Sequence, residues 1–106
     1  MQEAGRTHEA IEQFDQALRL NPELAQAHYN LGLALEGVSR VQEAIPQYEE
    51  ALRLKPDYAD AHNNLGNVLA RQGKLAEASA SYRQALDLRP EFASQLVATG
   101  MATVER

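Results

Sequence analysis

The stretch His28-Tyr-Asn-Leu-Gly-Leu-Ala-Leu35 returns later in the chain as His62-Asn-Asn-Leu-Gly-Asn-Val-Leu69. An aromatic residue keeps the same step, since Tyr48 returns as Tyr82. A fixed period of about 34 residues indicates one supersecondary unit that stacks on copies of itself. The same step also separates three prolines, Pro22, Pro56 and Pro90.

The period divides the 106 residues, which are few enough for one domain, into four segments. Residues 25–58 and 59–92 are full units, and residues 1–24 are the back part of another unit. Residues 93–106 are the front part of a fourth unit, and we expect them to cap the stack. Because natural arrays rarely begin inside a unit, we also expect that this chain was cut from a longer array.

Each full unit contains two apolar stripes with the spacing of an amphipathic helix. Proline ends the second helix of each unit, because the residue before proline is forced out of helical geometry. The stripes predict an all-α, right-handed solenoid of antiparallel helix pairs. Its helices, about six in number, are expected over residues 6–20, 25–37, 41–54, 59–71, 75–88 and 93–104.

Three glycines and one serine carry separate expectations. Gly32 and Gly66 lie inside predicted helices, where glycine costs about 1 kcal/mol relative to alanine. We therefore expect a neighbouring helix to approach closely over each missing side chain. Gly73 marks the turn between the helices of the second full unit. Ser39 stands at this place in the first full unit, and the glycine lies two residues earlier at Gly37, so we expect that turn to be displaced or less sharp.

The composition excludes several classes of function. Ten Lys and Arg residues against fifteen Asp and Glu residues give a net charge of -5, which disfavours nucleic-acid binding. The apolar runs are too short for a transmembrane helix, and the first residues do not resemble a secretory signal. The sequence contains no cysteine, so disulfides and thiolate metal sites are excluded. We expect a cytoplasmic protein that contacts no membrane.

The histidines and tyrosines do not form a catalytic pattern. His28 and His62 fall in different units with no third ligand at a useful spacing, so packing at a helix contact is favoured over metal binding. Tyr48 and Tyr82 fit core anchors whose hydroxyls reach the edge of the core. No nucleophile triad, phosphate loop or carboxylate pair meets the requirements of an active site. We expect no enzyme activity, no metal and no cofactor.

These recurring positions resemble the tetratricopeptide repeat family. The pattern His-x-x-Leu-Gly-x-x-Leu, then Ala-x-x-x-Tyr, then Pro occurs in both full units. Ala10 and Phe14, followed by Pro22, give the back half of the pattern once more. The resemblance implies a non-catalytic scaffold for protein–protein interaction. In such a scaffold, the first helix of each unit lines a concave groove that holds a peptide or a partner helix.

The resemblance also defines the candidate groove. The units are similar to the repeats of the O-linked N-acetylglucosamine transferase superhelix, in which asparagines hold an extended peptide, and Asn30 and Asn64 match those asparagines. Asparagine is a poor helix former, and its amide suits a peptide backbone, although solvated side chains remain an alternative. A carboxylate clamp needs several cations in the groove, and only Arg71 qualifies there, while the negative charges of Glu36 and Asp60 disfavour a clamp. The candidate groove residues are Gln26, Tyr29, Asn30, Leu33, Asp60, Asn63, Asn64, Asn67, Arg71, Val97 and Met101.

Two other functions stay open in the sequence. The chain starts with the second helix of a unit and ends with a first helix, so the terminal half-units of different copies could complete one another. Such contacts build a ring, a fibre or an exchanged dimer. The chain could also be the recognition arm of a larger enzyme, and the sequence names neither a partner nor a pathway. The residues expected to associate are Ile11, Phe14, Leu18, Leu96, Val97 and Met101.

Overall fold

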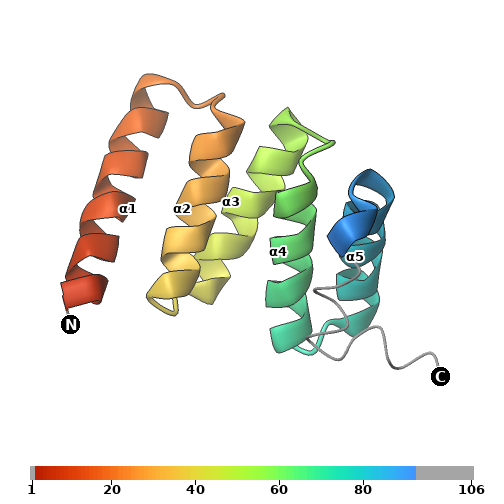
Figure 1. Ribbon diagram of the computed structural model, residues 1–106. Coiled ribbons are helices and arrows are strands. Elements are labelled where there is room, and N and C mark those ends of the chain that lie inside the picture. Colours follow the sequence, from red (N-terminus) through yellow and green to blue (C-terminus); the bar gives the residue numbers. More distant parts are fainter. Residues whose placement is uncertain (1, 93–106) are drawn as a thin grey trace.

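A computed structural model describes the backbone of residues 2–92 and the side chains of residues 5–91. In this part, five α-helices follow one another in a row, each running roughly antiparallel to the next (Figure 1). The described residues contain no strand, so the fold is the all-α helical repeat that the sequence predicts. The elements are α1 Gln2–Leu20, α2 Ala25–Gly37, α3 Val41–Leu54, α4 Ala59–Arg71, α5 Leu75–Leu88 and a 3₁₀ turn, η1 Pro90–Phe92.

The predicted helix bounds agree with the structure for α2, α3, α4 and α5. The start of α1 differs, because the helix begins at Gln2 and runs through Gly5 instead of beginning at residue 6. Gly5 does not have the positive φ that Gly73 has at the equivalent position, so the helix continues through it. The helix predicted over residues 93–104 lies outside the described residues.

The prolines end helices as predicted. Lys55 precedes Pro56 and has φ -139° and ψ 85°, and Arg89 precedes Pro90 and has φ -143° and ψ 89°. Both residues are extended, because the proline ring excludes helical geometry from the residue before it. The chain therefore leaves α3 and α5 with the same geometry, at the same place in each full unit.

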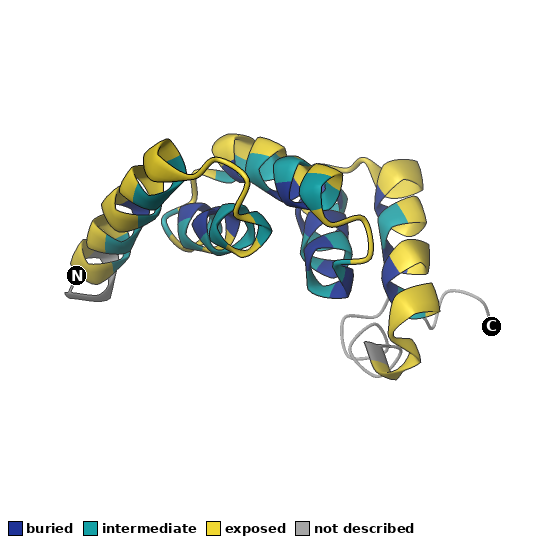
Figure 2. Cartoon of the chain, turned by 90° about the horizontal axis from the view of Figure 1, so that it is seen from above, coloured by how far each residue is buried: buried dark blue, intermediate teal, exposed yellow. Residues whose placement is uncertain are grey.

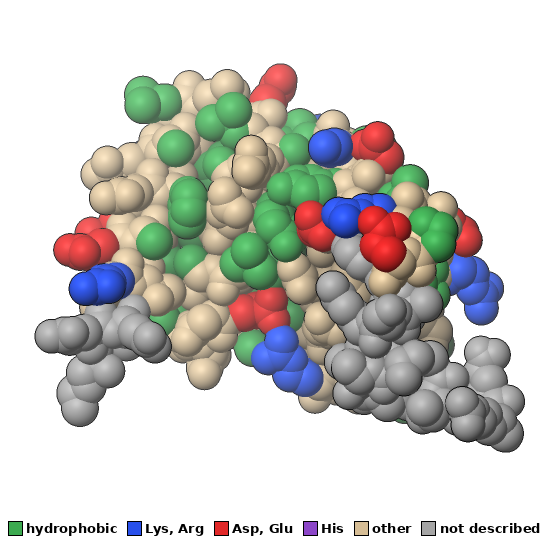
Figure 3. All heavy atoms as spheres, in the orientation of Figure 1, with side chains coloured by type: hydrophobic (Ala, Val, Ile, Leu, Met, Phe, Trp, Pro, Cys, Tyr) green, Lys and Arg blue, Asp and Glu red, His purple; other side chains and the backbone are tan. Residues whose placement is uncertain are grey.

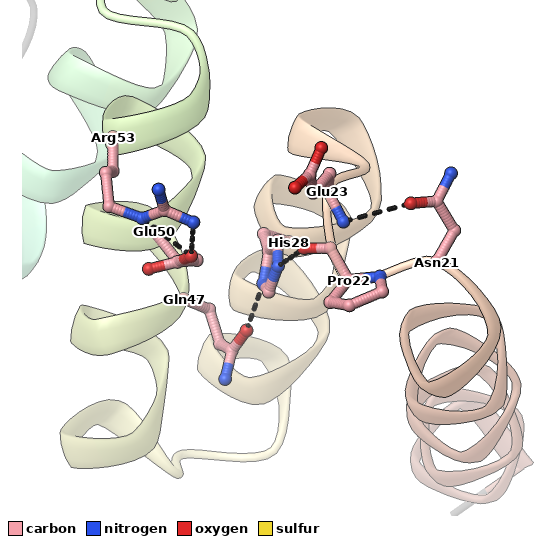
Figure 4. A network of polar contacts seen from close by, with 7 residues as sticks. All are labelled: Asn21, Pro22, Glu23, His28, Gln47, Glu50 and Arg53. Carbon is pink, nitrogen blue, oxygen red and sulfur yellow. Dashed lines mark hydrogen bonds and ion pairs between the residues drawn. The ribbon is translucent and has the colours of Figure 1, made fainter.

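His28 holds the loop between α1 and α2 against α3 (Figure 4). Its Nε2 lies 2.9 Å from the carbonyl oxygen of Pro22 and donates to it, because a carbonyl oxygen only accepts. Its Nδ1 lies 2.8 Å from the side-chain amide of Gln47 on α3. His62 repeats the first contact, with its Nε2 at 3.0 Å from the carbonyl oxygen of Pro56. Both histidines therefore hold a loop to the helix that follows it.

Burial follows the row of helices, and buried residues lie mainly on the sides that face neighbouring helices (Figure 2). Tyr48 and Val68 are the largest side chains that are fully buried. Because each helix buries its apolar side against its neighbours in the row, stability comes from local contacts between adjacent units. The main core cluster is Ile11, Leu31, Leu35, Ala44, Tyr48, Leu65, Val68, Leu69, Ala78 and Tyr82.

The two helical glycines sit beneath tyrosine rings. A Cβ atom on Gly32 would lie 2.6 Å from Cε1 of Tyr48, and a Cβ atom on Gly66 would lie 2.8 Å from Cδ1 of Tyr82. Both distances are shorter than van der Waals contact, so only glycine lets each ring lie flat against the neighbouring helix. This confirms the predicted close approach, and it explains why glycine recurs where helix propensity disfavours it.

The turn between α2 and α3 corrects the sequence prediction. Ser39 has φ 63° and Gly73 has φ 80°, so both residues occupy the left-handed region at the same place in their units. The same bonds close both turns, with the Arg40 amide donating to Leu35 at 2.8 Å and the Lys74 amide to Leu69 at 2.9 Å. The expectation of a displaced turn is wrong, because these closing bonds impose the geometry whichever residue is present.

Replacing Ser39 by glycine is expected to raise the free energy of unfolding by about 1 kcal/mol, because a side chain in the left-handed region costs about 1–2 kcal/mol. The matched reverse change, Gly73→Ser, is expected to lower it by a similar amount. Urea denaturation followed by circular dichroism measures both variants. A loss of stability in Ser39→Gly would contradict the assigned backbone geometry.

Candidate functional site

Two polar contacts join α2 to α4, and each links residues 35 positions apart. The Nδ2 of Asn64 donates to the Tyr29 hydroxyl at 2.7 Å, and the guanidinium of Arg71 donates to the Glu36 carboxylate. In both pairs the separation is one repeat unit plus one residue. A residue on α2 therefore contacts the residue on α4 that follows its own equivalent. We call Tyr29, Glu36, Asn64, Asn67 and Arg71 the α2–α4 face.

The hydroxyl groups of two core tyrosines bond to polar side chains of this face. The Tyr48 hydroxyl donates to the Glu36 carboxylate, and the Tyr82 hydroxyl donates to Oδ1 of Asn67 at 2.5 Å. The Glu36 side chain is only 13% exposed, and its carboxylate is paired with the Arg71 charge and accepts a hydrogen bond from the Tyr48 hydroxyl. The tyrosines therefore hold the polar groups of the face in fixed orientations.

Three aromatic rings meet at the end of the face where α2 and α4 begin. The Tyr29 ring centre lies 4.9 Å from that of Tyr58 and 5.8 Å from that of Tyr48. Burial, and then the nearby Asp60 carboxylate, raise the pKa of Tyr29 to about 12. Burial, and then the hydrogen bond to Glu36, raise the pKa of Tyr48. Both hydroxyls are therefore protonated at neutral pH and can donate.

The predicted groove residues do not all lie on one surface. Tyr29, Asn64 and Asn67 are half-buried and Arg71 is exposed, and the structure brings these four together on the α2–α4 face. Asp60 is near enough to Tyr29 to raise its pKa, but its Oδ1 also lies 3.7 Å from the Arg89 guanidinium, in a hollow lined by the start of α4 and the end of α5. Gln26 is exposed near the start of α2, and Val97 and Met101 lie outside the described residues.

Asn63 does not lie on an open surface. Its exposed fraction is 9%, whereas the sequence places it among the groove residues. The reason is that α4 is covered on more sides than α2, with seven buried residues against three. The position equivalent to Asn63 in the preceding unit is Tyr29, whose larger ring reaches the surface while the shorter amide does not.

Asn30 and Leu33 face a different hollow, between α1 and α2. This space of about 410 Å³ is lined mainly by apolar groups, and we call it the α1–α2 groove. The surface over α1 and α2 presents apolar and uncharged polar side chains with few charges (Figure 3). The lining residues are Arg6, Thr7, Ala10 and Phe14 from α1 and Asn30, Leu33, Ala34 and Gly37 from α2.

The residues predicted to mediate contacts between copies do not form one surface either. Ile11 is 6% exposed and packs into the core of its own chain, so it is not part of an open surface. Leu18 lines a hollow with Leu31 and Gln47, outside the α1–α2 groove. Phe14 lines the groove itself. Leu96, Val97 and Met101 lie outside the described residues.

The sequence reasoning missed Tyr58, whose ring packs on Tyr29. A signal was present, because the equivalent positions 24, 58 and 92 of successive units hold Leu, Tyr and Phe. It also missed that Glu36 pairs with Arg71 across units. That pair is shifted by one position from the repeat, so a search for equivalent positions does not find it.

The described residues offer neither a metal site nor a helix that could span a membrane. Residues 2–92 contain no cluster of three His, Asp or Glu side chains that could hold a metal ion. None of the described helices has both the length and the apolar character needed to cross a membrane.

Comparison with known families gives matches along most of the chain. A family described as TPR repeat matches residues 3–38 and 39–73, and one described as Tetratricopeptide repeat matches residues 59–92. No protein of curated function matches the chain.

Several solved structures are similar to this one. MamA is 27% identical with a TM-score of 0.80, over 94% of this chain and 63% of that chain. YrrB, described as a TPR protein with an unusual peptide-binding site, is 23% identical with a TM-score of 0.80, over 92% of this chain and 50% of that chain. The chain thus spans less than two thirds of MamA and half of YrrB.

A third structure is the type III secretion translocator chaperone SycD of Yersinia enterocolitica, in an alternative dimer. It is 22% identical with a TM-score of 0.83, over 97% of this chain and 82% of that chain. At these identities, the likeness to YrrB and SycD shows a shared fold alone.

Proposed function

Because the chain belongs to the tetratricopeptide repeat family, we propose that it is a non-catalytic interaction module that holds an extended peptide on the α2–α4 face. Helical repeat arrays use the surface formed by their first helices to bind partners. The face defined above lies on α2 and α4, which are the first helices of the two full units.

The observation that carries this proposal is the Asn64 amide. One of its N–H groups donates to the Tyr29 hydroxyl, which fixes the orientation of the side chain. Within residues 5–91, the carbonyl oxygen and the second N–H remain for a ligand, and together they match the donor and acceptor of a peptide group. A side chain that is already oriented loses less conformational entropy when it binds.

The charges of the face favour a backbone-directed partner over a terminal carboxylate. Arg71 is bound to Glu36, so its charge is already compensated. The net charge of the whole chain is -5, which further disfavours an acidic partner. The peptide-binding site in the name of YrrB belongs to that protein, and it supports this proposal only as a precedent on a shared fold.

Replacing Asn64 by alanine is expected to weaken peptide binding about tenfold, because a peptide group without its partner costs about 1–3 kcal/mol. An array of random-sequence peptides identifies a bound peptide, and fluorescence anisotropy then measures its affinity. The control is Gln84→Ala, which removes an exposed amide on α5 and is expected to leave the affinity unchanged. The proposal fails if no peptide binds, or if both variants bind with equal strength.

A second candidate function is self-association, and the α1–α2 groove favours it. The groove is apolar, and Leu33 within it is 40% exposed. Light scattering over a range of concentrations tests this function. The measured mass is expected to rise with concentration, and a constant monomer mass would reject it.

A further inference from the structure

The polar side chains of the α2–α4 face bond to the chain itself, and these bonds decide which of their groups stay open to a ligand. The Tyr29 hydroxyl accepts from Nδ2 of Asn64 at 2.7 Å, so its own O–H remains a donor with no acceptor among residues 5–91. Oδ1 of Asn67 accepts from the Tyr82 hydroxyl at 2.5 Å, so the described side chains leave both N–H groups of Asn67 open. Asn67 lies one turn after Asn64, so these groups follow one another along α4.

Hydrogen-bond donors outnumber acceptors among the open groups. The donors are the Tyr29 O–H, one N–H of Asn64 and both N–H groups of Asn67, whereas Asn64 supplies the open carbonyl. Burial, and then the Asp60 carboxylate, raise the pKa of Tyr29 to about 12, so its hydroxyl keeps the proton that it donates. An ordinary peptide brings one N–H for every carbonyl. The face therefore fits a ligand that has more carbonyl oxygens than N–H groups.

The charged groups around the face are compensated within the chain. The Arg71 guanidinium is paired with the Glu36 carboxylate. Oδ1 of Asp60 lies 3.7 Å from the Arg89 guanidinium. A charged ligand would have to displace one of these pairs, so the face favours an uncharged segment of a partner.

Two tyrosine rings stand beside the open donors. The ring centres of Tyr29 and Tyr58 lie 4.9 Å apart, with 39° between the ring planes, and both side chains are half-buried. Nζ of Lys55 lies 4.9 Å from the centre of the Tyr58 ring and restrains that ring. Surfaces lined by aromatic rings bind peptides in the polyproline II conformation, which is already ordered before it binds.

We propose that the peptide held on the α2–α4 face is proline-rich, with a proline ring packed on Tyr29 and Tyr58 and with carbonyl oxygens bonded to Tyr29 and Asn67. This inference rests on the proposed function and names the class of peptide. Proline has a carbonyl oxygen but no N–H, so it satisfies the donors of the face without adding donors of its own. A polyproline II helix makes no internal hydrogen bonds, so its carbonyl oxygens are free to accept.

The test uses two uncharged, fluorescently labelled peptides with blocked termini: decaproline, and a peptide of equal length in which serine and alanine alternate. Fluorescence anisotropy is expected to show that decaproline binds about tenfold more tightly. If peptides from the random-sequence array bind through Asn64 but decaproline binds no better than the serine–alanine peptide, this inference alone is overturned. If neither probe nor any array peptide binds, the proposed function fails with it.

Asn67→Asp tests the donors, because it keeps an oxygen for the Tyr82 hydroxyl and turns the two open N–H groups into an acceptor. It is expected to weaken decaproline binding about tenfold and to leave the serine–alanine peptide, which has N–H groups of its own, bound at least as tightly as before. Damage to the fold would weaken both peptides alike, and that result would overturn the assigned role of Asn67. The control is Gln84→Glu, the same change on an exposed part of α5, which is expected to leave both affinities unchanged.

Tyr58→Leu tests the aromatic contact. Leucine stands at the equivalent position 24 of the preceding unit, so the fold accepts this side chain there. The variant is expected to weaken decaproline binding about fivefold, because an aromatic contact contributes beyond the area that it buries. Circular dichroism checks that the variant keeps its helices. An unchanged affinity for decaproline would overturn the proposed packing of proline on these rings.

Discussion

Tyr48→Ala is expected to lower the free energy of unfolding by about 3–5 kcal/mol, the cost of removing a large aromatic side chain from a packed core. Tyr48 has no exposed surface, and it contacts the helix before it through Gly32 and the polar face through Glu36. Its loss therefore leaves a cavity at the centre of the main core cluster and removes the hydroxyl that orients Glu36. Urea denaturation followed by circular dichroism measures the change.

Tyr48→Phe separates the two contributions. It keeps the ring and removes only the hydroxyl, so its cost is expected to be about 1.5–3 kcal/mol, the range for a hydrogen bond to a charged group. An unfolding midpoint unchanged in Tyr48→Ala would mean that this ring is not a core residue.

Gly32→Ala is expected to destabilise the protein by about 1–3 kcal/mol, which is the usual cost of overpacking a core. The added Cβ would lie 2.6 Å from Cε1 of Tyr48, and that ring has no free space into which to move. Helix propensity alone predicts the opposite sign, because alanine is favoured over glycine by about 1 kcal/mol inside a helix. The sign of the measured change therefore decides between packing and propensity.

Gly5→Ala is the matched control for this substitution. It also changes a glycine inside a helix, but a Cβ atom there would meet nothing within 4 Å. It is expected to stabilise the protein by about 0.5–1 kcal/mol. If Gly32→Ala and Gly5→Ala both stabilise the protein, the assigned contact with Tyr48 is wrong.

The helices could be predicted from the sequence because their signals are local. Apolar spacing and proline fix the bounds of α2 to α5 within each unit, and the repeated Gly32 and Gly66 reveal the close approach. The turn at Ser39 could not be predicted from its residue type. Its geometry is set by backbone bonds that close the helix, and a serine there tolerates a strained angle that a glycine would adopt freely.

The candidate site was harder to predict because its contacts cross from one unit to the next. The repeat shows which residues are equivalent, but not that Tyr29 meets Asn64 or that Glu36 meets Arg71. Those pairs depend on the offset between neighbouring helices. Equivalent positions also differ in surroundings, since Asn64 lies beside Tyr29 while its counterpart Asn30 lines the α1–α2 groove.

The central claim is that the two helices of each full unit are held together by the contact between a tyrosine ring and a glycine inside the neighbouring helix. A double-mutant cycle of Gly32→Ala and Tyr48→Leu tests it most directly, by urea denaturation of the four proteins. The account predicts that Gly32→Ala destabilises the protein when Tyr48 is present but is neutral or stabilising in the Tyr48→Leu background, with a coupling of about 1–3 kcal/mol. An equal effect of Gly32→Ala in both backgrounds would contradict it.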